Sequence, residues 1–183
     1  MKEKSIGLIE LSSVAAGFLV ADTMLKASEI RLILSRSICS GKFMVLIGGD
    51  TAAVQCAVEA GEQAAKGCLI DSTVITNIHP DVFVALGRTQ LAEPSGALGI
   101  IESFNIATLI EAADAAAKSA NITLLEVRLA MALGGKAFAT MTGDVASVEA
   151  AIEAGKKVIS AAGTLVNAVI IARPHAELYR EII

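Results

Sequence analysis

The sequence contains two copies of one pattern, and this duplication constrains the fold more than any other feature. Ile6-Gly7-Leu8-Ile9-Glu10 recurs 92 residues later as Leu98-Gly99-Ile100-Ile101-Glu102. Further matches follow in the same order; they pair Lys26 with Lys118, Gly49-Asp50 with Gly143-Asp144, and Val58-Glu59-Ala60-Gly61 with Ile152-Glu153-Ala154-Gly155. We therefore expect two domains of one fold, residues 1–87 and 98–183, joined by a polar linker over residues 88–97.

Each copy is expected to follow the order β-α-β-β-α-β. In the first copy the predicted strands are Ile6–Glu10, Ile30–Ile38, Phe43–Ile47 and Thr73–Ile78. Ser12 or Ser13 is suited to cap a first helix that ends near Ser28, and Asp50 to cap a second; Asn105 and Asp144 hold the same places in the second copy. The apolar spacing predicts that Val14, Phe18, Ala21 and Leu25 form the buried face of the first helix. The fold class is therefore α+β, a ferredoxin-like variant with helices packed on an antiparallel sheet.

Composition excludes several classes of protein. The 183 residues are 54% hydrophobic with a net charge of −4, which is not the composition of a disordered chain. The longest uncharged run, Val158–Ala172, is too short to span a membrane, and no Lys/Arg cluster suggests nucleic acid or anionic lipid as a partner. No catalytic motif is present, so an enzyme is not expected. The mean hydropathy of +0.65 predicts apolar surface that other subunits cover.

The duplicated residues also carry a family resemblance. They are Leu98–Glu102, Glu111-Ala112-Ala113-Asp114, Lys118, Gly143-Asp144 and Arg173-Pro174-His175, and together they resemble the bacterial microcompartment (BMC) shell domain. The resemblance implies a homotrimer whose six domains imitate a hexagonal tile, packed with other shell proteins in the shell of a compartment within the cytoplasm. It also implies tile-edge contacts at Lys26, Lys118 and Arg173, although Asn77 stands at the Arg173 position of the first copy.

The same resemblance places the loop between the two middle strands at a central pore, and there the copies differ. The pore-loop residues are Ile38, Cys39, Ser40 and Gly41 in the first copy and Met131, Ala132, Leu133 and Gly134 in the second. One copy therefore offers a thiol, and the other offers a longer apolar loop.

One Cys39 per chain cannot form a metal site, but three-fold symmetry would bring three thiols to one axis. Soft thiolates favour iron–sulfur clusters, zinc or copper(I). Three of them match three irons of a [4Fe–4S] cluster with a non-protein ligand on the fourth, and zinc with three thiolates and water is the alternative. The resemblance favours the [4Fe–4S] cluster, shared by three subunits, as a route for electrons across the shell or as a source of clusters for enclosed redox enzymes.

Two other functions stay open at this point. The trimer could be a metal-free pore for metabolites, with Cys39 unmetallated, or the chain could be a soluble pair of small-molecule-sensing domains. The remaining cysteines, Cys56 and Cys68, fall in or near an apolar helical run and are expected to be core residues.

Overall fold

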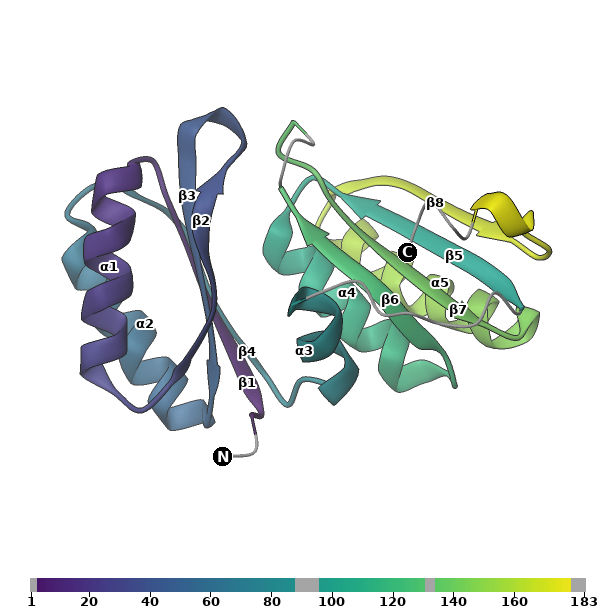
Figure 1. The fold of residues 1–183 in the computed structure, drawn as a ribbon, viewed down its shortest axis with the longest axis horizontal. Coiled ribbons are helices and arrows are strands. Elements are labelled where there is room, and N and C mark those ends of the chain that lie inside the picture. The colour runs from purple at the N-terminus through teal and green to yellow at the C-terminus, as the bar shows by residue number, and fades with distance from the viewer. Residues whose placement is uncertain (1–2, 88–95, 131–133, 179–183) are drawn as a thin grey trace. The chain divides into compact units, whose positions relative to one another are not determined.

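A computed structural model describes residues 3–87, 96–130 and 134–178 (Figure 1). The elements of the first repeat are β1 (Ser5–Leu11), α1 (Val14–Ala27), β2 (Arg31–Ile38), β3 (Lys42–Gly49), α2 (Thr51–Ala65) and β4 (Leu69–Thr76). A short helix follows, α3 (Pro80–Gly87). Those of the second repeat are β5 (Ala97–Ser103), α4 (Ile106–Ser119), β6 (Thr123–Leu129), β7 (Ala137–Gly143), α5 (Val145–Ala161) and β8 (Leu165–Ile171).

Each repeat forms one antiparallel four-stranded sheet, in the order β2-β3-β1-β4 and β6-β7-β5-β8. In the first repeat α1 and α2 lie together on one face of the sheet (Figure 1). The duplicated β-α-β-β-α-β order and the α+β class predicted from the sequence are confirmed. The sequence did not predict α3.

The helices approach the central strand of each sheet closely because glycine stands at the contact. A Cβ on Gly7 of β1 would lie 2.7 Å from Val58 Cγ2 of α2, and one on Gly99 of β5 would lie 2.8 Å from Val148 Cγ1 of α5. These distances are shorter than carbon atoms allow, so the helix–sheet packing in both repeats depends on the missing side chain. Residues that alternate with Gly7, such as Ile6 and Leu8, point to the other face of the sheet, which we call the helix-free face.

The predicted caps are confirmed at the four principal helices. The side chains of Ser13, Asp50, Asn105 and Asp144 each accept a hydrogen bond from a backbone N–H in the first turn of the following helix. The bond from Thr108 N–H to Asn105 Oδ1 is 2.8 Å long, and the one from Ser147 N–H to Asp144 Oδ1 is 2.9 Å. The bonds from Ser147 hold the pKa of Asp144 below its ordinary value, since they stabilise the carboxylate.

Two predictions about the helices and strands of the first repeat are wrong. β4 is Leu69–Thr76 rather than Thr73–Ile78, because the left-handed residues Lys66 and Gly67 end α2 early and the left-handed Asn77 lies beyond the strand. The buried face of α1 consists of Gly17, Val20, Ala21 and Met24; of the four predicted core residues only Ala21 belongs to it, whereas Val14, Phe18 and Leu25 are exposed.

The chain divides into two compact units, Met1–Pro80 and Asp81–Ile183, each with its own sheet and helices. Residues 88–95 of the predicted linker lie outside the described residues, and Gly96 precedes β5 with φ +93°. No helix in the described part of the chain is long and apolar enough to cross a membrane.

Candidate functional site

The site predicted from Cys39 lies at the tip of the hairpin between β2 and β3. Ile38 pairs with Lys42 across the strands, so only Cys39, Ser40 and Gly41 form the loop, as one turn of 3-10 helix. Ser40 and Gly41 have φ values of +65° and +73°, which reverse the chain within three residues. Ile38 is buried, and Cys39 is partly exposed. The short loop thus places a thiol at the end of a paired hairpin rather than in a core.

The corresponding hairpin of the second repeat, between β6 and β7, has a longer loop. Leu129 pairs with Ala137, and Ala130 donates its N–H to the Lys136 carbonyl oxygen at 3.1 Å. Gly134 and Gly135 have positive φ, and the predicted pore residues Met131, Ala132 and Leu133 lie outside the described residues. The described part of this loop contains no cysteine, so the difference between the copies is one of length and of chemistry.

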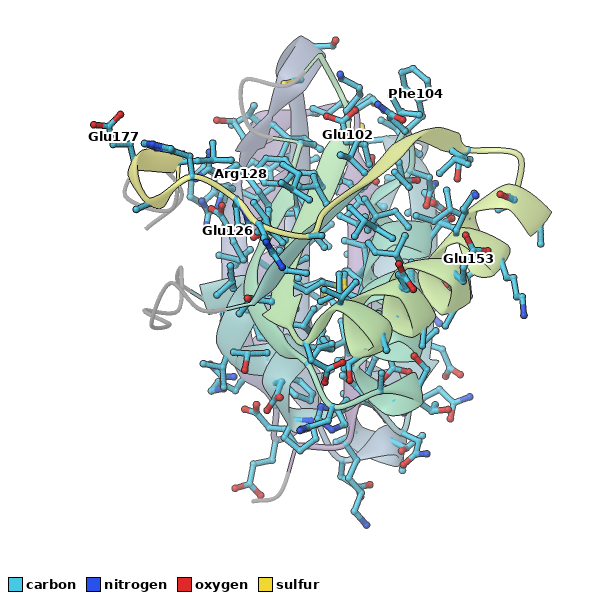
Figure 2. The ribbon with its side chains drawn as sticks, turned by 90° about the vertical axis from the view of Figure 1, so that its right-hand side faces the viewer. Glu102, Phe104, Glu126, Arg128, Glu153 and Glu177 are labelled. Carbon is cyan, nitrogen blue, oxygen red and sulfur yellow. The ribbon has the colours of Figure 1, made fainter. Side chains whose placement is uncertain are left out.

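An ion pair is repeated beside the loop of both hairpins. Lys42 Nζ lies 3.7 Å from Glu10 Oε2, and Lys136 Nζ lies 3.7 Å from Glu102 Oε2. Each glutamate lies on the helix-free face of its sheet. Glu102 is labelled in Figure 2. Our reading of the sequence missed this pair, although the same residues recur in both copies and could have signalled it.

The two ion pairs differ in their surroundings. Glu10 is buried, and its cross-strand neighbour on β4 is Asp71, whereas Glu102 is more exposed and faces Asn167 on β8. Burial raises the pKa of Glu10 above its ordinary value; Lys42 opposes this shift, and the charge of Asp71 adds to it. The loop that carries Cys39 therefore lies beside three charged side chains, Lys42, Glu10 and Asp71. The loop of the second repeat lies beside two, Lys136 and Glu102.

The other two cysteines of the first repeat lie on α2 and just after it. The prediction that Cys56 is a core residue is wrong: α2 turns Val54, Ala57 and Val58 inward, and Cys56 is exposed, with its thiol 3.8 Å from the Ala27 carbonyl oxygen. Cys68 is partly buried and packs against the first core, as expected.

The predicted edge residues differ in exposure. Lys26 forms a 2.6 Å ion pair with Asp22 on α1, and its side chain is 74% exposed. Lys118 forms the same 2.6 Å pair with Asp114 on α4, but it is only 38% exposed and the Asp114 side chain is nearly buried. Arg173 is exposed just after β8. An edge role for these residues stays a prediction.

A metal site cannot be assembled from the described residues of a single chain. Over residues 3–87, 96–130 and 134–178, no group of three or more His, Cys, Asp or Glu side chains is arranged to hold an ion. A metal bound by Cys39 would therefore need ligands from other copies of the chain or from outside the protein.

Comparison with known proteins identifies the class to which this fold and its duplication belong. The family model for the BMC domain matches twice, at residues 5–78 and 97–174, so the chain belongs to the BMC domain family. With two such domains in one chain, it is a tandem-domain structural protein of the bacterial microcompartment shell.

Within this class the chain is similar to the microcompartment shell protein PduT of Citrobacter freundii, with 38% identity over 98% of both chains. It is also similar to a solved microcompartment protein from Desulfitobacterium hafniense, with 48% identity, a TM-score of 0.94, and coverage of 97% of this chain and 98% of that one. The shell protein EutM of Salmonella typhimurium is 42% identical over 82 residues, which are 45% of this chain and 83% of EutM. The tandem-domain BMC shell protein that the sequence suggested is confirmed, and the similarity to PduT extends over nearly the whole chain.

Proposed function

We propose that three copies of this chain form a pseudohexameric tile of a microcompartment shell, and that Cys39 from each copy ligates one shared [4Fe–4S] cluster at the central pore. The tile is a structural, non-enzymatic component, and its neighbours are other shell proteins of a compartment within the cytoplasm. The cluster gives the tile a second task, the transfer of electrons across the shell.

The observation that carries the proposal is the position of Cys39 at the tip of a three-residue hairpin loop in one repeat only. In a ring of three such chains, equivalent residues stand at equal distances from the axis, and the Cys39 hairpins alternate with the longer hairpins of the second repeat. A three-fold set of thiols then arises without a second cysteine in the loop.

The donor chemistry of this hairpin fits an iron–sulfur cluster. A partly exposed thiol can reach a group beyond its own chain, whereas a thiol packed in a core cannot. Thiolate sulfur is the usual protein ligand of such clusters, and three of them leave one iron for a non-protein ligand. When bound, the cluster would supply one-electron exchange; the residues of the chain hold it and separate it from the two sides of the shell.

The test is to purify the protein anaerobically and to measure iron, acid-labile sulfide, visible absorption and the electron paramagnetic resonance signal. We expect about four irons and four sulfides per three chains, and their loss in Cys39→Ser. Cys56→Ser is the matched control, since Cys56 is exposed on a helix of the same repeat and should leave all four readouts unchanged.

Other outcomes separate the alternatives. A trimer without iron or sulfide, unchanged by Cys39→Ser, would favour the metal-free metabolite pore. Three-thiolate zinc would appear as about one zinc per trimer without a visible band. A chain that forms no trimer would contradict the shared site itself.

A further inference from the structure

The hairpin that carries Cys39 differs from its counterpart in charge as well as in the length of its loop. Residues 31–49 form β2, the loop and β3, and they include no Asp or Glu. The cations of this hairpin are Arg31, Arg36 and Lys42. The counterpart in the second repeat, residues 123–143, includes one carboxylate and fewer cations. Its charged residues are Glu126, Arg128 and Lys136. The greater positive charge therefore occurs in the hairpin that offers the thiol.

Arg36 and Lys42 are the first charged residues of the chain on either side of Cys39. Lys42 pairs across the strands with Ile38, the residue before Cys39, so the Cα atoms of Lys42 and Cys39 lie within about 9 Å of each other. Arg36 lies three residues before Cys39 on β2, and its side chain leaves the same face of the sheet as that of Lys42. Two cations therefore flank the thiol within its own hairpin, whereas Arg31 lies at the opposite end of β2.

The carboxylates nearest to Lys42 belong to other strands. Glu10 lies on β1 and Asp71 on β4, and in the sheet order β2-β3-β1-β4 both of these strands lie beyond the hairpin. The Lys42–Glu10 ion pair is 3.7 Å long, compared with 2.6 Å for the Lys26–Asp22 pair on α1. The sheet thus separates its charges, with the cations on the two strands that hold Cys39 and the carboxylates on the other two.

In the second repeat the charges are not separated in this way. Arg128 donates from Nε to Glu126 Oε1 at 2.8 Å, and Figure 2 shows the two side chains next to each other. Both residues lie on β6, so the positive charge of Arg128 is offset within its own hairpin. The position equivalent to Glu126 is Leu34 in the first repeat, and β2 consequently carries no carboxylate. The charge difference between the hairpins therefore accompanies the presence of Cys39.

We propose that Lys42, together with Arg36, raises the reduction potential of the cluster that the Cys39 thiolates hold. The inference rests on the proposed function and names the residues that regulate the same site. Three thiolates leave a bound [4Fe–4S] cluster anionic, and reduction by one electron adds a further negative charge. Net charge is one of the properties that set the potential of such a cluster. Cations about 10 Å away are only partly screened at about 0.1 M salt, so Lys42 and Arg36 of each copy favour the reduced form.

The test is a redox titration of the anaerobically purified full chain, with dithionite as the electron donor and the electron paramagnetic resonance signal of the reduced cluster as the readout. We expect Lys42→Gln to lower the ratio of reduced to oxidised cluster at a fixed potential by about tenfold or more, which is about 59 mV or more for one electron. Lys42→Arg keeps the charge and should stay close to the wild type. Lys26→Gln is the matched control, because Lys26 lies at the end of α1 that leads into β2, and the eight residues of β2 separate that end from the loop.

Arg36→Gln gives a second measurement, and its potential should shift in the same direction as that of Lys42→Gln. Circular dichroism and iron analysis show whether each variant folds and holds a cluster; if Lys42→Gln does neither, the potential of Arg36→Gln decides. If the charge-removing variants that hold a cluster shift the potential no more than Lys26→Gln does, the inference is wrong while the proposed function stands. Wild-type protein without iron and sulfide would instead contradict the proposed function, and this inference with it.

Discussion

At the scale of residues, the two repeats fill the same contact between a helix and a strand with side chains of opposite size. In the first repeat Gly17 of α1 lies against Phe43 of β3, and a Cβ on Gly17 would fall 2.1 Å from the Phe43 ring. In the second repeat the equivalent positions hold Leu109 and Ala137, both fully buried. The first repeat has a small residue on the helix and a large one on the strand, and the second repeat has a large residue on the helix and a small one on the strand. The total side-chain volume at this contact is therefore nearly the same in both.

This exchange predicts a coupling between two substitutions. Gly17→Leu should lower the free energy of unfolding by about 3 kcal/mol or more through overpacking, and Phe43→Ala by about 3–5 kcal/mol through a cavity. The double variant Gly17→Leu/Phe43→Ala copies the second repeat and should cost at least about 1 kcal/mol less than the sum. Urea unfolding of the four proteins measures the coupling; strict additivity would contradict it.

Glu10 is the residue whose titration should be visible in the stability of the protein. Its pKa is raised by burial above the ordinary 4.5, so the folded state holds this proton more firmly than the unfolded state does. The contribution of Glu10 to stability is therefore most favourable below pH 4.5 and is lost as the pH rises through the raised pKa.

We expect the free energy of unfolding of Glu10→Gln, relative to that of the wild type, to increase as the pH rises from about 4 toward 7. This trend is expected even if losing the contact with Lys42 makes the variant less stable overall. Urea unfolding at several pH values measures the difference. Glu102→Gln is the matched control for the loss of a carboxylate beside a lysine, because Glu102 is more exposed and faces Asn167 instead of Asp71. A flat difference for Glu10→Gln would show that burial does not control this carboxyl.

At the scale of elements, the sequence predicted the order and the caps because these depend on local chemistry. Ser13, Asp50, Asn105 and Asp144 each precede an apolar run and each accept a backbone hydrogen bond. The turn at Ser40-Gly41 could also be predicted from the sequence. Closing the hairpin needs two residues of left-handed backbone, and Ser and Gly are residue types found in turns.

The face of α1 could not be predicted in the same way. Periodicity finds apolar residues on one side of a helix, but it does not distinguish a domain core from a surface that another molecule covers. Phe18 and Val14 satisfy the pattern and yet are exposed, whereas Gly17, which lies in the core, adds nothing to an apolar pattern. The exposure of Cys56 was missed for the same reason.

At the scale of the whole molecule, only the part of the candidate site that lies within one chain could be predicted from the sequence. The sequence located the Cys39 loop, and the hairpin confirms that location between β2 and β3. The remaining ligands of the proposed cluster are the same residue in other copies, so neither the sequence nor the fold of one chain can bring them together.

The edge of the tile gives the last prediction, and it depends on the difference between Lys26 and Lys118. Both are expected at tile edges, but only Lys118 neutralises a carboxylate that is nearly buried. Lys26→Ala should change the free energy of unfolding by less than about 0.5 kcal/mol, since exposed ion pairs contribute little. Lys118→Ala should cost about 1 kcal/mol or more, because Asp114 loses a partner in a less polar setting.

Both substitutions should reduce the extended sheets seen by electron microscopy of concentrated protein, since each removes a cation from the edge of the tile. Lys26→Ala is the more informative of the two, because it should leave the fold and the trimer unchanged, and the loss of sheets then cannot be attributed to unfolding. Lys66→Ala, at the exposed end of α2, provides a comparison for the loss of one positive charge. Sheets of normal extent from Lys26→Ala protein, at a concentration where the wild type assembles, would remove Lys26 from the tile edge.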